Sequence, residues 1–497
     1  MMLMSMFTPS PILVCILENH DFVNEVQTVT QLFFPGAKYE FVNSPIVEYP
    51  NGYVIKTSIV CNTASACVQK DNCIVAKHSL SLEELPLYLS PRRTLMLSLY
   101  HALQAAVGAH TPWGALTGIR PSKMVREWLD AGFSHDKVIA TLIDPFCCTL
   151  EKAQLALTVA CAERDLTSRI YNMPLSFPVN CGVSEKPVGI YVSIPFCPTR
   201  CVYCSFNVNH NFASPDIHAQ YVTAVIQECT TQAKRLKEVG GTVSSIYVGG
   251  GTPTSLNENL LEQLLEAVNK NFYTNNIEYT VEAGRPDTLT KAKLQLLRNY
   301  KVNRVAVNPQ TLNDKTLKAI GRKHMACDFF KAFALARDTG FECINADIIA
   351  GLPGETVDNM RHTIEGVVEL SPENITVHTL AIKRASRLNE TLGEFAIPSA
   401  TTIEEMLKIA NKACTDSGLN PYYLYRQKNM VGMFENVGYS KPGYECLYNV
   451  GMMAETQTVL GVGAGAVSKF VADGKIRREF NVKNPEVYIQ RKWSEDK

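Results

Sequence analysis

The sequence lacks an excess of charge of either sign, long hydrophobic runs and any basic residue near its start. Its 497 residues include 48 Lys and Arg and 48 Asp and Glu. This balance argues against nucleic acid as the main partner, because nothing supplies a global basic field. No apolar run approaches the roughly 18 residues that a membrane span needs. The stretch 1–17 is apolar, but no Lys or Arg precedes Lys38, so we interpret it as a strand and not a signal peptide. We therefore expect a cytoplasmic protein.

The composition is that of an ordinary globular protein, with 46% hydrophobic and 19% charged residues, which excludes disorder, collagen and coiled coil. The length predicts two or three structural regions. Sixteen cysteines are many for a cytosolic chain. Most stand alone in apolar surroundings, as Cys15 does in ILVCIL and Cys343 in FECINADI, and we interpret these as small buried hydrophobic residues rather than as disulfides.

The first 180 residues predict an α+β domain of unknown role. Short strands are expected at 12–17, 39–42 and 52–58, and the pattern turns helical over 82–157. The loop 111–121 contains two prolines, two glycines and a Trp, which favours a packed turn before a helix over a catalytic loop. Three prolines and little periodicity over 174–187 indicate a linker.

From Gly189 onward, apolar strands alternate with helical segments. Strands are expected at 189–194, 244–248, 277–282, 303–307, 343–349 and 375–380, and helices at 215–238, 257–271, 290–299, 326–339 and 355–370. Six such units predict an α/β fold with a parallel sheet curved into a partial barrel, in which function collects at the carboxyl ends of the strands. We place this barrel at 188–400. A C-terminal region, 401–497, opens with a helix at 402–417 and contains a Gly-rich strand at 459–467.

The strongest chemical signal is GIYVSIPFCPTRCVYCSF, residues 189–206, directly after the first strand of the barrel. Cys197, Cys201 and Cys204 can point inward from one tight loop at one metal site. One interpretation is structural zinc, with His210 as fourth ligand. The other is a [4Fe–4S] cluster held by three cysteines with one iron left open. Because zinc sites usually pair two short cysteine knuckles and no second one exists here, the motif favours the cluster.

This loop, followed by YVGGGTPTSL at 247–256, resembles the radical S-adenosylmethionine (SAM) superfamily, and within it the oxygen-independent coproporphyrinogen III oxidase family. The resemblance covers roughly 189–470. With WGALTGIRPSK at 113–123 and the chain length, it is most similar to the HemZ-type coproporphyrinogen dehydrogenases. It implies a partial (β/α)6 barrel with an N-terminal α+β domain and a C-terminal oxidase-like extension. It also implies a [4Fe–4S] cluster on the three cysteines, whose open iron chelates SAM.

The resemblance assigns further residues to the cofactors. Tyr203 would press against the cluster and the adenine, and Tyr191 resembles a tyrosine that approaches SAM at the end of the first strand. In Gly249–Pro253, glycines permit close approach and positive φ, so the amides of Gly250, Gly251 and Thr252 can bind a carboxylate or direct the SAM amino group. Glu282 would hold ribose hydroxyls.

A second group of residues resembles the family's site for a second SAM molecule. Gln310 follows the fourth strand, Arg322 lies twelve residues later, Asp347 ends the fifth strand, and Ala381 follows the sixth. The resemblance gives Tyr191 and Arg322 catalytic roles. The substrate carries four carboxylates, so basic groups should clamp them at the barrel mouth. The candidates are Arg322, Lys383, Arg384 and Arg387, although the run 383–387 is equally well explained as a solvated loop.

The sequence also departs from the family. Phe206 stands where the oxidases commonly have a fourth cysteine, and Ser193 stands where they commonly have His. The haem chaperones of the superfamily lack the fourth cysteine and carry an HNxxYW motif. The matching stretch here, Tyr448–Met453, keeps the Asn but loses the His and the aromatic pair. Met452 and Met453 are more typical of packing than of haem ligands.

The resemblance therefore implies conversion of coproporphyrinogen III to protoporphyrinogen IX without oxygen, in haem biosynthesis. A 5′-deoxyadenosyl radical would take hydrogen from a propionate, CO2 would leave, and one electron would pass to an acceptor. A reductant such as flavodoxin or ferredoxin is the expected partner. A haem chaperone or carrier, or a radical SAM enzyme acting on another tetrapyrrole, stays open as an alternative.

Overall fold

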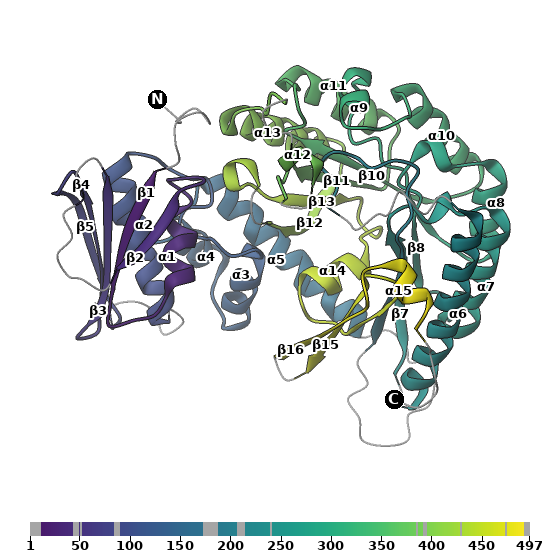
Figure 1. Cartoon of the computed structure of the whole chain (residues 1–497), viewed down its shortest axis with the longest axis horizontal. Coiled ribbons are helices and arrows are strands. Elements are labelled where there is room, and N and C mark those ends of the chain that lie inside the picture. The colour runs from purple at the N-terminus through teal and green to yellow at the C-terminus, as the bar shows by residue number, and fades with distance from the viewer. Residues whose placement is uncertain are drawn as a thin grey trace. The chain divides into compact units, whose positions relative to one another are not determined.

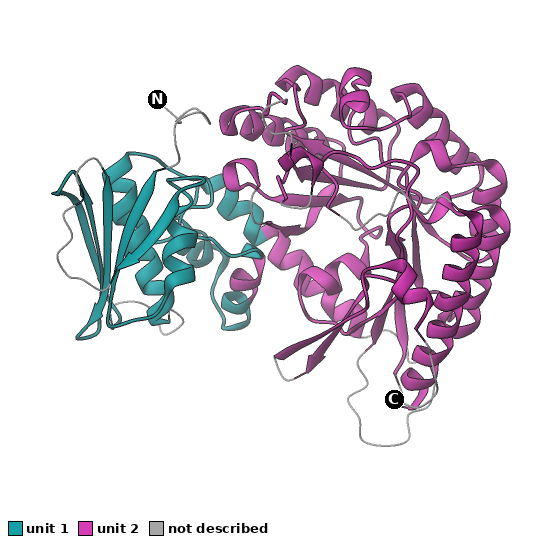
Figure 2. Cartoon of the chain, in the orientation of Figure 1, with its two compact units in different colours: residues 1–121, 127–157 teal, residues 122–126, 158–497 magenta. Residues whose placement is uncertain are grey.

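The computed structural model describes residues 11–42, 49, 52–83, 90–171, 187–205, 214–238, 241–383, 386–390, 395–427, 430–472 and 475–491. The chain forms two compact units (Figure 2). Unit 1 comprises residues 1–121 and 127–157, and unit 2 comprises 122–126 and 158–497. Among the described residues, no helix is both long enough and apolar enough to cross a membrane.

Unit 1 is built on a five-stranded sheet of order β2-β1-β3-β4-β5. The strands are β1 (Ile12–Glu18), β2 (Lys38–Val42), β3 (Tyr53–Val60), β4 (Thr63–Lys70) and β5 (Cys73–Ser81). The helices are α1 (Val23–Thr30), α2 (Pro91–Val107), α3 (Pro121–Asp130), α4 (His135–Ile143) and α5 (Leu150–Tyr171), the last two-thirds of which belong to unit 2. The three predicted strands and the helical stretch are confirmed. The strands β4 and β5 were not predicted, because their buried positions carry small side chains such as Ala64 and Ala66.

The loop 111–121 is the packed turn that its composition predicts. Trp113 is buried, and Gly114 adopts φ +52° against the neighbouring loop. A Cβ on Gly114 would lie 1.9 Å from the carbonyl oxygen of Phe146, so only glycine fits this position. The stretch therefore serves packing within unit 1.

Unit 2 contains an α/β partial barrel (Figure 1). Six parallel strands lie side by side in chain order: β6 (Val188–Ile194), β7 (Val243–Gly250), β8 (Glu278–Glu282), β9 (Arg304–Ala306), β10 (Cys343–Ala350) and β11 (Asn374–Thr379). The connecting helices are α6 (Pro215–Glu238), α7 (Glu258–Phe272), α8 (Lys291–Asn299), α9 (Asp314–Ala319), α10 (Ala326–Asp338) and α11 (Val357–Glu369). The predicted (β/α)6 arrangement is confirmed, and each helix follows its strand as a right-handed crossover requires.

The C-terminal residues extend both edges of this sheet to eleven strands. At one edge, β13 (Asn436–Ser440) and β12 (Asn420–Tyr425) add to β11 in antiparallel order. At the other edge, β14 (Val459–Val462) pairs with β6 in parallel, followed by β15 (Val467–Ala472) and β16 (Lys475–Phe480). Helices α12 (Arg387–Glu390), α13 (Ala400–Asp416), α14 (Leu447–Met453) and α15 (Pro485–Ile489) complete the unit. The domain boundaries predicted near residues 180 and 400 stay predictions.

Candidate functional site

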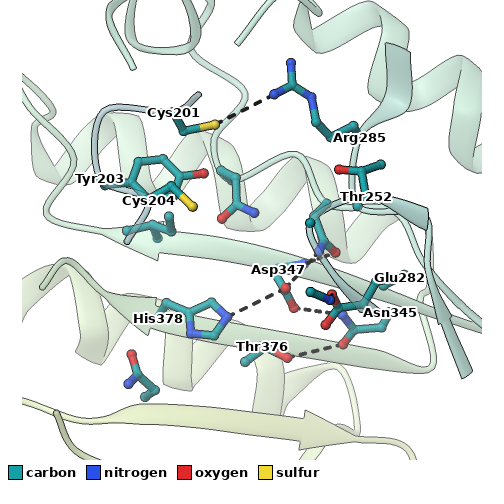
Figure 3. A pocket seen from close by; sticks show the side chains of 18 of the residues that line it. Cys201, Tyr203, Cys204, Thr252, Glu282, Arg285, Asn345, Asp347, Thr376 and His378 are labelled. Atoms are coloured by element: carbon teal, nitrogen blue, oxygen red, sulfur yellow. Dashed lines mark hydrogen bonds and ion pairs between the residues drawn. The ribbon is translucent and has the colours of Figure 1, made fainter. Parts of the chain in front are cut away.

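A cavity of about 390 Å³ lies inside the barrel of unit 2 and reaches the carboxyl ends of its strands. Nearly all predicted site residues line it: Cys197, Cys201, Tyr203, Cys204, Gly250, Gly251, Thr252, Glu282, Gln310, Arg322, Asp347 and Ala381. Tyr191 is not among the lining residues. Figure 3 shows the cysteine loop at one side of the cavity and Asp347 with Glu282 at the other. Residues from six strand ends, far apart in sequence, are thus brought to one space.

The cysteine loop follows β6 and is held by one backbone hydrogen bond within the loop and one to the segment that follows α9. The amide of Cys204 donates to the carbonyl of Cys201 at 3.1 Å, which closes a tight turn. The amide of Val202 donates to Ile320 at 3.0 Å. Cys197 Sγ lies 3.2 Å from Thr252 Oγ1. Burial raises the pKa of the Cys197 thiol to about 11, and nearby Cys204 adds to this, while Thr252 and Arg285 oppose it.

The donor set of this loop fits an iron–sulfur cluster. A single zinc ion would need three or four ligands around one point. Within the ranges that the structure describes, no group of three His, Cys, Asp or Glu side chains is arranged in that way. A cluster takes one thiolate for each of three irons, so its ligands lie further apart. His210 and Phe206 lie outside the described residues.

The glycines of the motif 249–253 are required for packing of β7 against the cysteine loop. A Cβ on Gly251 would lie 2.5 Å from the carbonyl oxygen of Phe196, and Gly250 adopts φ +103°. The amides of Gly250, Gly251 and Thr252 donate to Glu282, Ile194 and Phe196, respectively. In this structure these amides donate within the protein, and the expectation that they bind SAM stays a prediction. The motif presses the cysteine loop against β7.

Tyr191 does not end the first strand, since β6 continues to Ile194. Its ring stacks on Tyr247 and Tyr448, with centroids at 6.3 and 6.1 Å, and those two rings stack on each other at 4.5 Å. Burial raises the pKa of Tyr191 far above its ordinary range. A Cβ built on Gly250 would lie 3.3 Å from the Tyr191 hydroxyl, so Tyr191 packs beside the glycine motif, and its expected approach to SAM stays a prediction.

Arg322 connects three loops through hydrogen bonds of its guanidinium group. Its Nη1 donates to the carbonyl oxygens of Asn308 at 2.7 Å and Gly284 at 3.2 Å, and its Nη2 donates to the Tyr203 hydroxyl at 3.4 Å. Only Nε is buried without a partner among the described residues. The role of Arg322 as a clamp for substrate carboxylates is therefore not supported. Its contacts fix Tyr203 within the cysteine loop.

Arg285 is a residue that the sequence analysis missed. It is 3% exposed and forms a two-point ion pair with Asp287. Its Nη1 donates to the Thr199 carbonyl at 3.3 Å and lies 3.9 Å from Cys201 Sγ (Figure 3). The sequence GRPD at 284–287, just after the predicted strand that ends at Glu282, is the signal that could have identified Arg285 as a site residue. The geometry places a fixed positive charge beside one cluster ligand.

Asp347 is the centre of a hydrogen-bond network in the cavity (Figure 3). It lies within β10, which continues to Ala350, so the expectation that it ends the strand is wrong. Its carboxylate accepts from Asn308 and Asn345, each at 2.8 Å, and lies 3.7 Å from His378 Nε2. Burial opposes its ionisation, but His378 and the amide donors hold its pKa below its ordinary value. These contacts stabilise the ionised form of the Asp347 carboxyl. Its neighbour His378 is a site residue that the sequence analysis did not predict.

Glu282 ends β8, as expected, and faces the same cavity. Its carboxyl accepts from the Tyr247 hydroxyl at 2.5 Å and from the Gly250 amide at 3.3 Å. Burial raises its pKa to about 7; Tyr247 lowers it, while the negative charge of Asp347 adds to the rise. A carboxyl with a raised pKa can form hydrogen bonds with neutral groups, so Glu282 suits the hydroxyl groups of a ligand.

Gln310 and Ala381 line the cavity beyond the fourth and sixth strands, where they were predicted. Gln310 adopts φ +67°, and its amide donates to the carbonyl of Asp347 at 2.9 Å. Its side-chain Oε1 is buried without a hydrogen-bond partner in the described part of the chain. An acceptor in that state is an open position for a ligand donor.

Of the remaining basic candidates, only Lys383 lines the cavity, and burial lowers its pKa. Arg387 is exposed on α12 and is not among the lining residues. Arg384 lies outside the described residues. Arg200, within the cysteine loop, also lines the cavity, as do Arg285 and Arg304.

Comparison with known proteins gives four findings. The family model of the Radical SAM superfamily matches residues 191–367. The Bacillus subtilis protein named oxygen-independent coproporphyrinogen-III oxidase-like protein HemZ is 37% identical over 94% of this chain and 92% of its own length. Heme chaperone HemW of the same species is 31% identical over 56% of this chain and 69% of its own. The solved structure of coproporphyrinogen III oxidase (HemN) from Escherichia coli, 26% identical, covers 62% of this chain and 69% of its own, with a TM-score of 0.49.

A three-cysteine loop at the carboxyl edge of a partial (β/α)6 barrel defines a radical SAM protein, and the family model agrees. The chain belongs to the HemZ family of oxygen-independent coproporphyrinogen-III oxidase-like proteins within that superfamily. Membership implies a [4Fe–4S] cluster and SAM as cofactors. The cavity residues described above are those that would hold them.

Proposed function

We propose that this protein oxidatively decarboxylates coproporphyrinogen III to protoporphyrinogen IX without oxygen. The observation that carries the proposal is the shared cavity, in which the cysteine loop faces Glu282, Gln310 and Asp347. Glu282 ends β8, Gln310 follows β9 and Asp347 lies within β10, so the three side chains come from successive strands of the barrel, near the edge where such a fold collects its chemistry. The likeness to the HemZ relative over nearly the whole chain supports the same reaction class.

Cys197, Cys201 and Cys204 would hold the cluster, and Glu282 and Gln310 would accept hydrogen bonds from SAM. When bound, these groups supply a carbon-centred radical that removes a hydrogen atom from the β-carbon of a propionate. The chain's own part is to orient the propionate toward that radical and to exclude water. The stacked rings of Tyr191 and Tyr247 and the hydrogen bonds of Arg322 to neighbouring loops keep the cavity walls fixed.

Asp347 and Gln310 also offer acceptors for a second SAM molecule, whose sulfonium and amino groups are cationic. The Nη atoms of Arg322 already donate to protein oxygens, so only its Nε, buried without a partner among the described residues, remains for such a molecule. A reductant such as flavodoxin or ferredoxin would reduce the cluster, and a separate acceptor would take the electron that leaves with CO2.

The chaperone alternative is less well supported by the geometry. Tyr448 occupies the position of the proposed haem-binding His, and its ring is 7% exposed and packed against Tyr191 and Tyr247. Met452 and Met453 pack against the same cluster of buried side chains. Asn449 and Met453 of this segment line the cavity, but Tyr448, at the position of the haem-binding His, is a packing group where a haem carrier needs an accessible ligand.

The proposal is tested by an anaerobic assay of the reconstituted protein with dithionite, SAM and coproporphyrinogen III. We expect 5′-deoxyadenosine formation to rise with substrate and to match the decarboxylated products, including the tricarboxylic intermediate. The Cys201→Ala variant is the control for cluster dependence. Stoichiometric haem retention through gel filtration, without decarboxylation, would contradict the proposal and support the chaperone alternative.

A further inference from the structure

Three cavity-lining side chains form a row across neighbouring strands of unit 2. Tyr425 of β12 is the register partner of Asn436 of β13. The antiparallel pairing of β13 with β11, which matches Val437 to Val377, places Asn436 opposite His378 one residue further on. Residues directly opposite each other on paired strands project to the same face, with Cβ atoms about 5 Å apart. All three line the cavity.

Asn436 carries an open donor into this row. Its side chain is 1% exposed, and its Oδ1 accepts from the Thr379 amide at 2.8 Å. This bond fixes which end of the amide is nitrogen. The remaining Nδ2 is buried and has no hydrogen-bond partner among the residues that the structure describes. A buried donor without a partner is unfavourable, so a ligand acceptor at this place is favoured.

His378 adds a second polar group beside it. Its side chain is 27% exposed, and its Nε2 lies 3.7 Å from Asp347 Oδ2. Nε2 therefore faces Asp347, and Nδ1 is the ring nitrogen that remains for a ligand in the cavity.

The β11 and β13 side of the cavity offers polar groups for an anionic ligand. Asn436 of β13 presents a donor, His378 of β11 presents a ring nitrogen, and Lys383 follows β11. Glu282 and Asp347 present carboxyls from β8 and β10, where Arg285, Arg304 and Arg322 also line the cavity. An anionic group is favoured beside the Asn436 donor and Lys383.

We propose that Asn436 Nδ2 and His378 bind a carboxylate of the substrate, and that the Tyr425 ring packs on the adjoining pyrrole. The ligand class is a tetrapyrrole carrying propionates, so this inference rests on the proposed function. The amino-acid part of SAM also carries a carboxylate, and the test must separate the two sources. Tyr425 suits the ring because it offers a flat apolar face beside polar groups.

The test measures binding of coproporphyrin III, a stable tetracarboxylate, and of its tetramethyl ester to the anaerobically reconstituted protein. Asn436→Asp keeps the acceptor for Thr379 and replaces the donor with an oxygen. His378→Asn removes the imidazole with little loss of polarity. Asn411→Asp is the matched control, since Asn411 of α13 accepts from Tyr439 Oη and does not line the cavity.

We expect each cavity variant to weaken binding of the tetracarboxylate about tenfold, as loss of a hydrogen bond to a charged group does. Binding of the ester, SAM affinity and iron content should not change, and Asn411→Asp should behave as wild type. Unchanged tetracarboxylate affinity in both variants, or a loss confined to SAM, would overturn the inference. If Asn436→Asp lowers the melting temperature, the tetracarboxylate affinity of His378→Asn alone decides the test. Wild type that binds the tetracarboxylate but never decarboxylates coproporphyrinogen III would overturn the proposed function and leave this subsite in place.

Discussion

Arg285 Nη1 lies 3.9 Å from Cys201 Sγ, and the same guanidinium is held by a two-point ion pair with Asp287. The side chain is 3% exposed, so solvent screens its charge only weakly. Hydrogen bonds and charge at ligand sulfurs are among the factors that set the potential of an iron–sulfur cluster. The contact therefore connects a loop outside the cysteine motif to the redox chemistry of the site.

We expect Arg285→Gln to make the cluster harder to reduce, because the reduced state gains negative charge that Arg285 stabilises. At a fixed low potential, the ratio of reduced to oxidised cluster should fall about tenfold, which corresponds to about 59 mV for a one-electron couple. A redox titration followed by electron paramagnetic resonance measures this. Arg337→Gln is the control, since Arg337 pairs with Glu373 away from the cavity. An unchanged potential at full iron content would rule out the effect.

Single replacement of Cys197, Cys201 or Cys204 by Ala should abolish the brown chromophore or SAM cleavage. The three thiols share one loop, whereas Cys343 and Cys446, which also line the cavity, lie in β10 and at the start of α14, so we expect neither to replace a lost ligand. Iron and acid-labile sulfide should be about four each per wild-type chain. Cys229→Ala and Cys414→Ala, both at fully buried thiols outside the cavity lining, are the controls. Tight zinc without iron in wild type would refute the cluster.

Gly251→Ala should displace the cysteine loop. The new Cβ would lie 2.5 Å from the Phe196 carbonyl oxygen and 2.8 Å from that of Ile194, and neither backbone group can move alone. Overpacking of this kind costs about 1–3 kcal/mol. We expect a lower melting temperature and incomplete cluster retention. Gly118→Ala is the control, because nothing lies within 4 Å of the position that its new methyl group would take. Full iron content and an unchanged melt would show that the loop adapts.

Asp347→Ala should reduce product formation at least tenfold while iron content stays within error of wild type. The carboxylate organises Asn308, Asn345 and His378, whereas the cluster ligands lie on another loop. Removing it leaves buried donors unpaired on the cavity wall. Asp347→Asn, which keeps the acceptor oxygen but not the charge, should fall between the two. Loss of the cluster in parallel with activity would contradict this separation.

Glu355 predicts a pH-dependent stability. Burial raises its pKa from 4.5 to about 7, against hydrogen bonds from Thr311 and Thr316 that lower it. The folded state therefore binds this proton more tightly than the unfolded state. Its contribution is full below pH 4.5 and is lost as the pH rises to about 7. The loss is at most about 3 kcal/mol.

The Glu355→Gln variant cannot ionise, so its stability relative to wild type should rise between pH 5 and pH 8. Urea unfolding at both values measures the difference. The side chain is 4% exposed, which keeps solvent from screening the effect. The same stability difference at both pH values would show that Glu355 does not carry it.

Local patterns were sufficient to predict the barrel and the cluster loop. The cysteine spacing and the alternation of strands and helices are properties of short segments, and six parallel strands follow from them. The packed turn at Trp113 follows in the same way from its glycines and prolines. The strands β12 and β13 were missed because tyrosines, amides and a proline give them no clear alternation.

Which residues line the cavity together depends on contacts between segments that are far apart in sequence. Asn436 meets His378 only because β13 adds antiparallel to β11, and Arg285 meets Cys201 only because the loop after β8 folds over the loop after β6. Tyr448 becomes a packed ring because α14 lies against β7. Strand order and register decide such meetings, since a shift of one residue turns a side chain to the opposite face of the sheet.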